Sequence, residues 1–161
     1  MIRPARAADI PAIHQMIRDL AGYERSLREV SATEDDLRAA LLAAPGAQPS
    51  LFGHVAEEDG QAVGFALWFL SYSTWLGRHG IYLEDLYVRP ERRGQGHGRA
   101  LLAELARICV ERGYPRLQWS VLDWNAPTRR FYESLGAAGM AEWTAYRLAG
   151  PALHALAASA S

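Results

Sequence analysis

The stretch that decides the fold is IYLEDLYVRPERRGQGHG, residues 81–98. Its first part, residues 81–88, has the composition of a β-strand, and glycines then recur at positions 94, 96 and 98. Apolar residues at helical spacing follow as far as Gly113. A glycine loop between a strand and a helix start directs several backbone N–H groups at one point, where the helix dipole adds positive potential. The stretch therefore predicts a phosphate-binding loop.

Nearby arginines can neutralise further phosphate charge, and they are Arg89, Arg92, Arg93 and Arg99. A dinucleotide-binding fold is the main alternative, because Asp123 stands where a ribose-binding acid belongs. Its glycine spacing differs, however, and Pro90 separates the strand from the glycines. A P-loop would need a Gly-Lys pair, which this sequence lacks.

The remaining pattern predicts an α/β fold with a mixed sheet of about six or seven strands flanked by helices. Before the glycine loop we expect a first strand, two helices and a hairpin, at residues 1–6, 10–20, 33–42, and 51–57 with 61–72. After it we expect a helix ending before Gly113, then a strand, a helix and a final strand or hairpin at residues 117–122, 125–136 and 140–148. The domain organisation predicted is one domain over residues 1–150 and an alanine-rich tail over 151–161.

Composition narrows the range of partners. The chain has 161 residues, half of them apolar, and a formal net charge of -1, so it has no basic field to attract nucleic acid or an anionic membrane. Its apolar runs are shorter than the roughly 20 residues of a membrane helix. With a single cysteine and no signal-peptide pattern, we expect a cytoplasmic protein. Histidines without ligand spacing predict no metal site.

The segment Arg93-Gly94-Gln95-Gly96-His97-Gly98 resembles the R/Q-x-x-G-x-G/A signature of the GNAT acyltransferase superfamily. Residues 2–148 are similar to its spermidine/spermine (diamine) and thialysine N-acetyltransferases, in the segments Ile2–Ala5, Tyr82–Val88, Asp123–Pro127 and Phe131–Tyr132. The resemblance implies a single-domain, mostly antiparallel sheet. It also implies direct transfer of acetyl from acetyl-CoA to a small-molecule primary amine, by a homodimer.

Two residues are candidates for the proton transfers. An alkylamine with a pKa near ~10.4 needs a base at neutral pH, and Glu84 is a carboxylate beside Asp85 in an apolar strand, where desolvation and like charge raise a carboxyl pKa. A surface charge on an edge strand is the alternative interpretation of Glu84. Tyr132 shares a helix face with Asn125, and could equally be a packing residue. The resemblance implies that Glu84 is the general base and Tyr132 the general acid.

The same resemblance implies the binding residues. For acetyl-CoA these are Leu86, Tyr87, Val88, the loop residues Arg93, Gly94, Gln95, Gly96, His97, Gly98 and Arg99, and Asn125 with Pro127. For the amine they are Tyr23, Glu24, Trp75, Glu84 and Asp85.

The chain departs from animal polyamine enzymes at Ser73, where they carry an acid, and at Tyr146, where they carry tryptophan. Polyamines and thialysine-like amines therefore both stay open as acceptors. A domain that binds acyl-CoA without turnover, as a sensor or structural module, is the alternative function.

Overall fold

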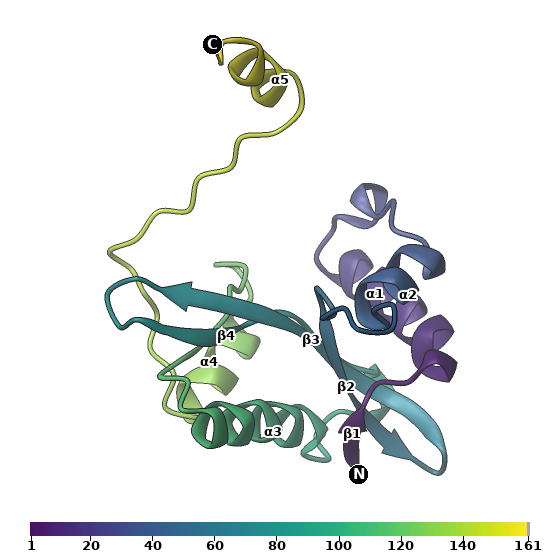
Figure 1. Cartoon of the computed structure of the whole chain (residues 1–161). Helices are drawn as coiled ribbons and strands as arrows, with labels where there is room; N and C mark the ends of the chain where they lie inside the picture. Colours follow the sequence, from purple (N-terminus) through teal and green to yellow (C-terminus); the bar gives the residue numbers. More distant parts are fainter. Residues whose placement is uncertain (161) are drawn as a thin grey trace. The chain divides into compact units, whose positions relative to one another are not determined.

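The computed structural model describes residues 1–160, so Ser161, the last residue of the predicted tail, lies outside the described residues. The chain divides into two compact units, the first being Met1–Leu122 and the second beginning at Asp123. The strands all belong to the first unit and form one sheet (Figure 1).

The sheet has five strands in the order β1-β2-β3-β4-β5, where β1 is Ile2–Pro4, β2 Phe52–Glu58, β3 Gln61–Ser73, β4 Arg78–Val88 and β5 Leu117–Gln118. Every neighbouring pair is antiparallel except β4 and β5, which are parallel. The structure confirms the mixed, mostly antiparallel sheet, although with five strands and not six or seven.

The predicted hairpin is confirmed as β2 and β3. Its turn contains Asp59 with φ 50° and Gly60 with φ 77°. Positive φ at both central residues defines a type I′ turn, for which Asp-Gly is a preferred pair because its twist matches that of the strands.

A β-bulge interrupts the pairing of β3 with β4. Leu67 pairs with Asp85, but the next residue, Trp68, pairs with Leu83. Glu84 is therefore the extra residue of β4, a position at which a bulge locally bends the strand.

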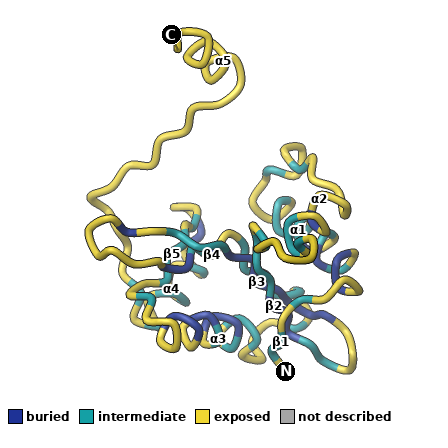
Figure 2. The backbone as a smooth tube through the Cα atoms, viewed as in Figure 1, coloured by how far each residue is buried: buried dark blue, intermediate teal, exposed yellow. Residues whose placement is uncertain are grey.

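Helices cover both faces of the sheet (Figure 1). On one face, α1 (Ile10–Tyr23) and α2 (Glu34–Leu41) pack against the strands, in a core that includes Ile13, Phe65 and Tyr87. On the other face lies α3 (His97–Arg112), whose Leu101 and Leu105 are fully buried. Short 3₁₀ turns cover the ranges Ala7–Asp9, Leu27–Glu29 and Pro90–Arg92. The buried residues concentrate in the strands and in α3 (Figure 2).

Local residues set the ends of α2 and α3, whereas Asp9 forms no side-chain capping hydrogen bond to α1. Thr33 caps α2 and exchanges hydrogen bonds with Asp36 in a capping box. Asp9 precedes α1 and binds the guanidinium of Arg3 at 2.8 and 2.9 Å, which lowers the pKa of the Asp9 carboxyl. Gly113 ends α3 in the left-handed region, at φ 67°.

The second unit contains α4 (Ala126–Ser134) and α5 (Gly150–Ala158). The predicted helix from Asn125 is confirmed as α4, but the predicted strand 140–148 is wrong, because these residues form neither helix nor strand. Trp143 and Tyr146 are 70% and 95% exposed. An apolar alternation indicates a strand only where a neighbouring backbone is available to pair with it.

The predicted strand 117–122 is shortened for the same reason. Only Leu117 and Gln118 find partners on β4.

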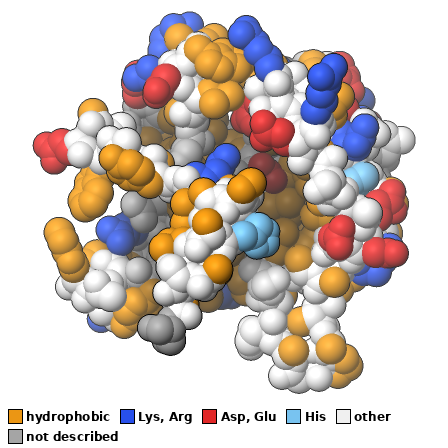
Figure 3. Space-filling view, turned by 90° about the horizontal axis from the view of Figure 1, so that it is seen from above, with side chains coloured by type: hydrophobic (Ala, Val, Ile, Leu, Met, Phe, Trp, Pro, Cys, Tyr) orange, Lys and Arg blue, Asp and Glu red, His pale blue; other side chains and the backbone are white. Residues whose placement is uncertain are grey.

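No helix within residues 1–160 is long and apolar enough to cross a membrane. Acidic and basic side chains are interspersed on the face drawn in Figure 3.

Candidate active site

The glycine loop connects β4 to α3 as the sequence predicts. Gly94 and Gly96 have φ of 74° and 86°, values that favour glycine, and Gly96 is the residue that precedes α3. A Cβ atom added at either position would meet nothing within 4 Å. The space in front of the loop is therefore open. The glycines allow the left-handed backbone conformation and leave room for a ligand to approach the backbone.

The loop presents a row of free backbone donors. Ala100 donates to the carbonyl of Gly96 as the first turn of α3 closes. Within the described residues, no acceptor is assigned to the backbone N–H groups of residues 94–99. Successive unpartnered N–H groups at the start of a 16-residue helix form an anion cradle. This arrangement fits the pyrophosphate of a CoA molecule.

The arginines next to the loop are used mainly to hold it. The backbone N–H of Arg89 donates to Val63 at 2.9 Å. Arg93 donates from Nε to the Val88 carbonyl at 2.9 Å, and its guanidinium lies 5.3 Å from the ring centre of Tyr87 and 5.8 Å from that of Tyr23. A direct contact between Arg93 and the cofactor stays a prediction.

A carboxylate from the β2–β3 turn joins the loop, a feature that sequence analysis did not find. Oε2 of Glu58 lies 3.1 Å from Nη1 of Arg92 and 3.6 Å from Nε2 of His97. The Glu58 oxygen and the His97 nitrogen are both buried and lack a hydrogen bond. Glu58 thus contacts one residue before the glycine loop and one residue within it.

One edge of β4 is open within the first unit. Residues 81 and 82 pair with β5, whereas Leu86, Tyr87 and Val88 pair only with β3. A strand edge without a partner offers backbone groups to an extended ligand. The open edge therefore suits the amide groups of a pantetheine arm, as predicted for these residues.

Acidic side chains gather beside this edge. Glu84 is exposed and Asp85 is half-buried. Burial, together with the charges of Glu84 and Glu24, raises the pKa of Asp85 to about 6. Desolvation also raises the pKa of Glu24. Glu24 follows α1, so the end of this helix brings the Glu24 carboxylate near Asp85 of β4.

Trp75 is not brought to this cluster. It lies in the turn between β3 and β4 and is 89% exposed. The part of β4 that precedes Glu84 separates Trp75 from Glu84 by roughly 20 to 30 Å at the usual rise of a strand. Ser73 is buried and its Oγ accepts a hydrogen bond from Leu76 N at 3.2 Å. Ser73 therefore caps the turn.

The second unit carries the other predicted residues. Asn125 is buried and precedes α4, where its Oδ1 accepts a hydrogen bond from Thr128 N at 3.4 Å. Pro127 lies in the first turn of the helix. Tyr132 is half-buried, with its ring centre 5.5 Å from that of Phe131.

These features define an acyltransferase, and comparison with known proteins agrees. The sequence profile of the acetyltransferase (GNAT) family matches residues 12–137. The chain belongs to this family and is an acetyl-transferring enzyme.

Two curated relatives match nearly the whole length of this chain. The chain is 38% identical to thialysine N-epsilon-acetyltransferase of Bos taurus, over 98% of this chain and 96% of that protein. It is 30% identical to an L-ornithine N5-acetyltransferase of Arabidopsis thaliana, over 96% and 86% of the two chains. An integron cassette protein of V. cholerae has the same fold, with a TM-score of 0.80 and 26% identity over 99% of this chain and 98% of that one.

Among residues 1–160, no group of three or more histidine, cysteine, aspartate or glutamate side chains is placed to hold a metal ion.

Proposed function

We propose that this enzyme transfers the acetyl group of acetyl-CoA directly to a primary amine of a small molecule, either a diamine or polyamine or a thialysine- or lysine-like amino acid. Acetyl-CoA supplies the acetyl group as an activated thioester. The observation that carries the proposal is the open edge of β4, flanked by the anion cradle at residues 94–99 and by the carboxylates Glu84 and Asp85.

Glu84 is the proposed general base. As the bulge residue of β4 it is exposed, so it can accept a proton from a bound ammonium group directly or through water. Asp85 and Glu24 surround the same place with negative charge. The neutral amine then attacks the acetyl carbonyl, forming the C–N bond as the C–S bond breaks. The nitrogen gives up one further proton as the amide forms, which replaces the proton that Tyr132 donates to the thiolate.

Tyr132 is the proposed general acid, which donates its hydroxyl proton to the leaving thiolate. Its position on α4, after a helix start at Asn125 and Pro127, matches the family motif quoted above. Cys109 is free and buried, and burial raises the pKa of its thiol. A covalent acyl-enzyme on Cys109 is therefore disfavoured, which supports direct transfer.

The acidic cluster supports an acceptor with a second cationic nitrogen. Glu24, Glu84 and Asp85 are close enough for their charges to couple, and the aromatic ring of Tyr23 lies next to Glu24 in the chain. The related proteins named above act on thialysine and on ornithine, and another relative, 33% identical, is a human spermidine/spermine N(1)-acetyltransferase-like protein.

We propose further that residues 1–150 act as one acetyltransferase domain with a short tail, as a homodimer in the cytoplasm. The family match at residues 12–137 extends across both structural units, which supports one functional domain.

The decisive experiment is a thiol-release assay with acetyl-CoA and a panel of amines: putrescine, spermidine, lysine, thialysine and ornithine. We expect CoA release with at least one diamine or diamino acid. Glu84→Gln should lower kcat/KM about 100-fold at neutral pH, with much of the loss recovered at high pH, where the free amine is abundant. CoA binding without release for any amine would contradict the proposal, and an unchanged rate in Glu84→Gln would remove Glu84 from the mechanism.

A further inference from the structure

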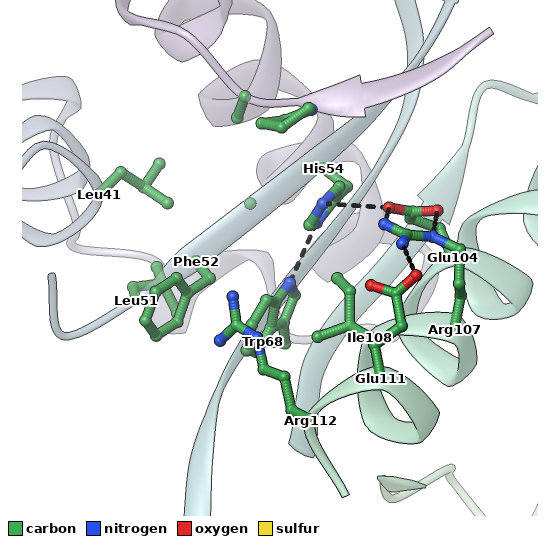
Figure 4. Close-up of a pocket in the computed structure, with 13 residues that line it drawn as sticks. Leu41, Leu51, Phe52, His54, Trp68, Glu104, Arg107, Ile108, Glu111 and Arg112 are labelled. Atoms are coloured by element: carbon green, nitrogen blue, oxygen red, sulfur yellow. Dashed lines mark hydrogen bonds and ion pairs between the residues drawn. The ribbon is translucent and has the colours of Figure 1, made fainter. Parts of the chain in front are cut away.

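A cavity of about 410 Å³ lies in the first unit, away from the glycine loop (Figure 4). It lies between the C-terminal half of α3 and the strands β1 to β3, and α2 contributes Leu41 to its wall. The glycine loop precedes the opposite end of α3. The volume is within the range of small-molecule sites, and none of the residues assigned above to acetyl transfer lines the cavity.

The wall of the cavity contains an aromatic pair. Phe52 and Trp68 stack with ring centres 4.4 Å apart and planes 17° from parallel. Trp68 is only 2% exposed, and Leu51 and Ile108 add apolar surface. Stacked rings within an apolar wall suit a planar, largely apolar ligand.

His54 adds a hydrogen-bond donor. The indole N–H of Trp68 donates to Nδ1 of His54 at 3.1 Å, so a neutral His54 carries its proton on Nε2. Burial lowers the pKa of His54, which favours this neutral form. Nε2 is 4.0 Å from Oε1 of Glu104, beyond hydrogen-bond distance. The Nε2–H group is therefore available to another acceptor.

The rim of the cavity carries two carboxylates and two arginines, and they differ in whether they have a partner. Arg107 donates to Glu104 at 2.6 and 2.9 Å and also to Glu111, so both carboxylates share one guanidinium. Arg112 also lines the cavity, and no described residue forms a hydrogen bond or ion pair with it. A cationic ligand would meet carboxylates that are already paired, whereas an anionic ligand would find an unpaired arginine.

We propose that this cavity is a second ligand site, which binds a small aromatic carboxylate. The ring packs against Phe52, which itself stacks on the buried Trp68, and the carboxylate accepts hydrogen bonds from Arg112 and from His54 Nε2. The site is separate from the acetyl-transfer site, so the inference stands whether or not the proposed function is correct.

Isothermal titration calorimetry of the full chain tests the site with benzoate as the probe and with benzylamine, benzamide and acetate as comparisons. Benzoate should bind more tightly than each of the other three, because only benzoate combines a ring with an anion. Arg112→Gln should weaken benzoate at least about tenfold, since a charge-assisted hydrogen bond is lost. The matched control is Arg116→Gln, an exposed arginine outside the cavity, which should keep wild-type affinity.

Thermal unfolding of both variants shows whether they are folded. No measurable binding of benzoate, equal binding of benzylamine or benzamide, or full affinity in a folded Arg112→Gln variant would each overturn the proposal. Acetate binding as tightly as benzoate would show a simple anion site and also overturn it.

Discussion

Substitution of Asp85 tests the acidic cluster through the stability of the protein. The pKa of Asp85 is raised from 3.8 to about 6 by burial and by neighbouring carboxylates. Its contribution to stability is therefore fully present below pH 3.8 and is lost as the pH rises through about 6. At about 1.4 kcal/mol for each pH unit between the two values, the ionised carboxylate costs the folded state about 3 kcal/mol.

Asp85→Asn removes this charge and keeps the shape of the side chain. The variant should be more stable than the wild type by about 2 to 3 kcal/mol at pH 8, and the difference should shrink toward zero near pH 4. Urea denaturation at a series of pH values measures it, because titrations common to both proteins cancel in the difference. Acetyl transfer should fall in the same variant, as expected when a destabilising charge serves function.

The control is Asp59→Asn, which makes the same change of side chain in the exposed turn between β2 and β3, outside the acidic cluster. If Asp85→Asn gave the same free-energy difference at pH 4.5 and pH 8, the raised pKa of Asp85 and the reasoning from its burial would be refuted.

Two further predictions concern the glycine loop. Gly96→Arg should abolish CoA binding in calorimetry while the protein stays folded, because the new side chain enters the open space before the loop. The left-handed φ of 86° at position 96 should also lower the stability of the variant by roughly 1 to 2 kcal/mol. Retained CoA affinity would show that the phosphates bind elsewhere. Glu58→Gln should raise the KM for acetyl-CoA about 2- to 5-fold with kcat unchanged, because it weakens the ion pair to Arg92 and the contact with His97. A lower KM would show instead that Glu58 repels the cofactor.

Features with local causes could be predicted from sequence. The type I′ turn needs only Asp59 and Gly60, the start of α2 needs Thr33 and Asp36, and the end of α3 needs Gly113. In each case the responsible residues are neighbours in the chain, so their pattern is visible without the fold. The glycine loop belongs to this group, because its conformation follows from glycines at fixed positions after a strand.

Features that depend on distant pairing could not be predicted. The sequence gives Glu84 and Asp85 as neighbours, but only the register against β3 shows that Glu84 is an extra residue. Glu58 lies far along the chain from Arg92 and His97, and nothing local signals their contact. The strand predicted at residues 140–148 does not form, and no described strand pairs with this segment.

The bulge in β4 means that Glu84 can be removed or inserted without changing the pairing of the residues on either side of it. Without it, the pairs Leu67 with Asp85 and Trp68 with Leu83 would follow one another in an uninterrupted antiparallel ladder, and every other side chain would keep its face of the sheet. A single-codon deletion at this place is therefore compatible with the rest of the fold, as is the insertion that reverses it. The sheet does not depend on the presence of this carboxylate, so its history can be sought in gains and losses of one codon as well as in substitutions.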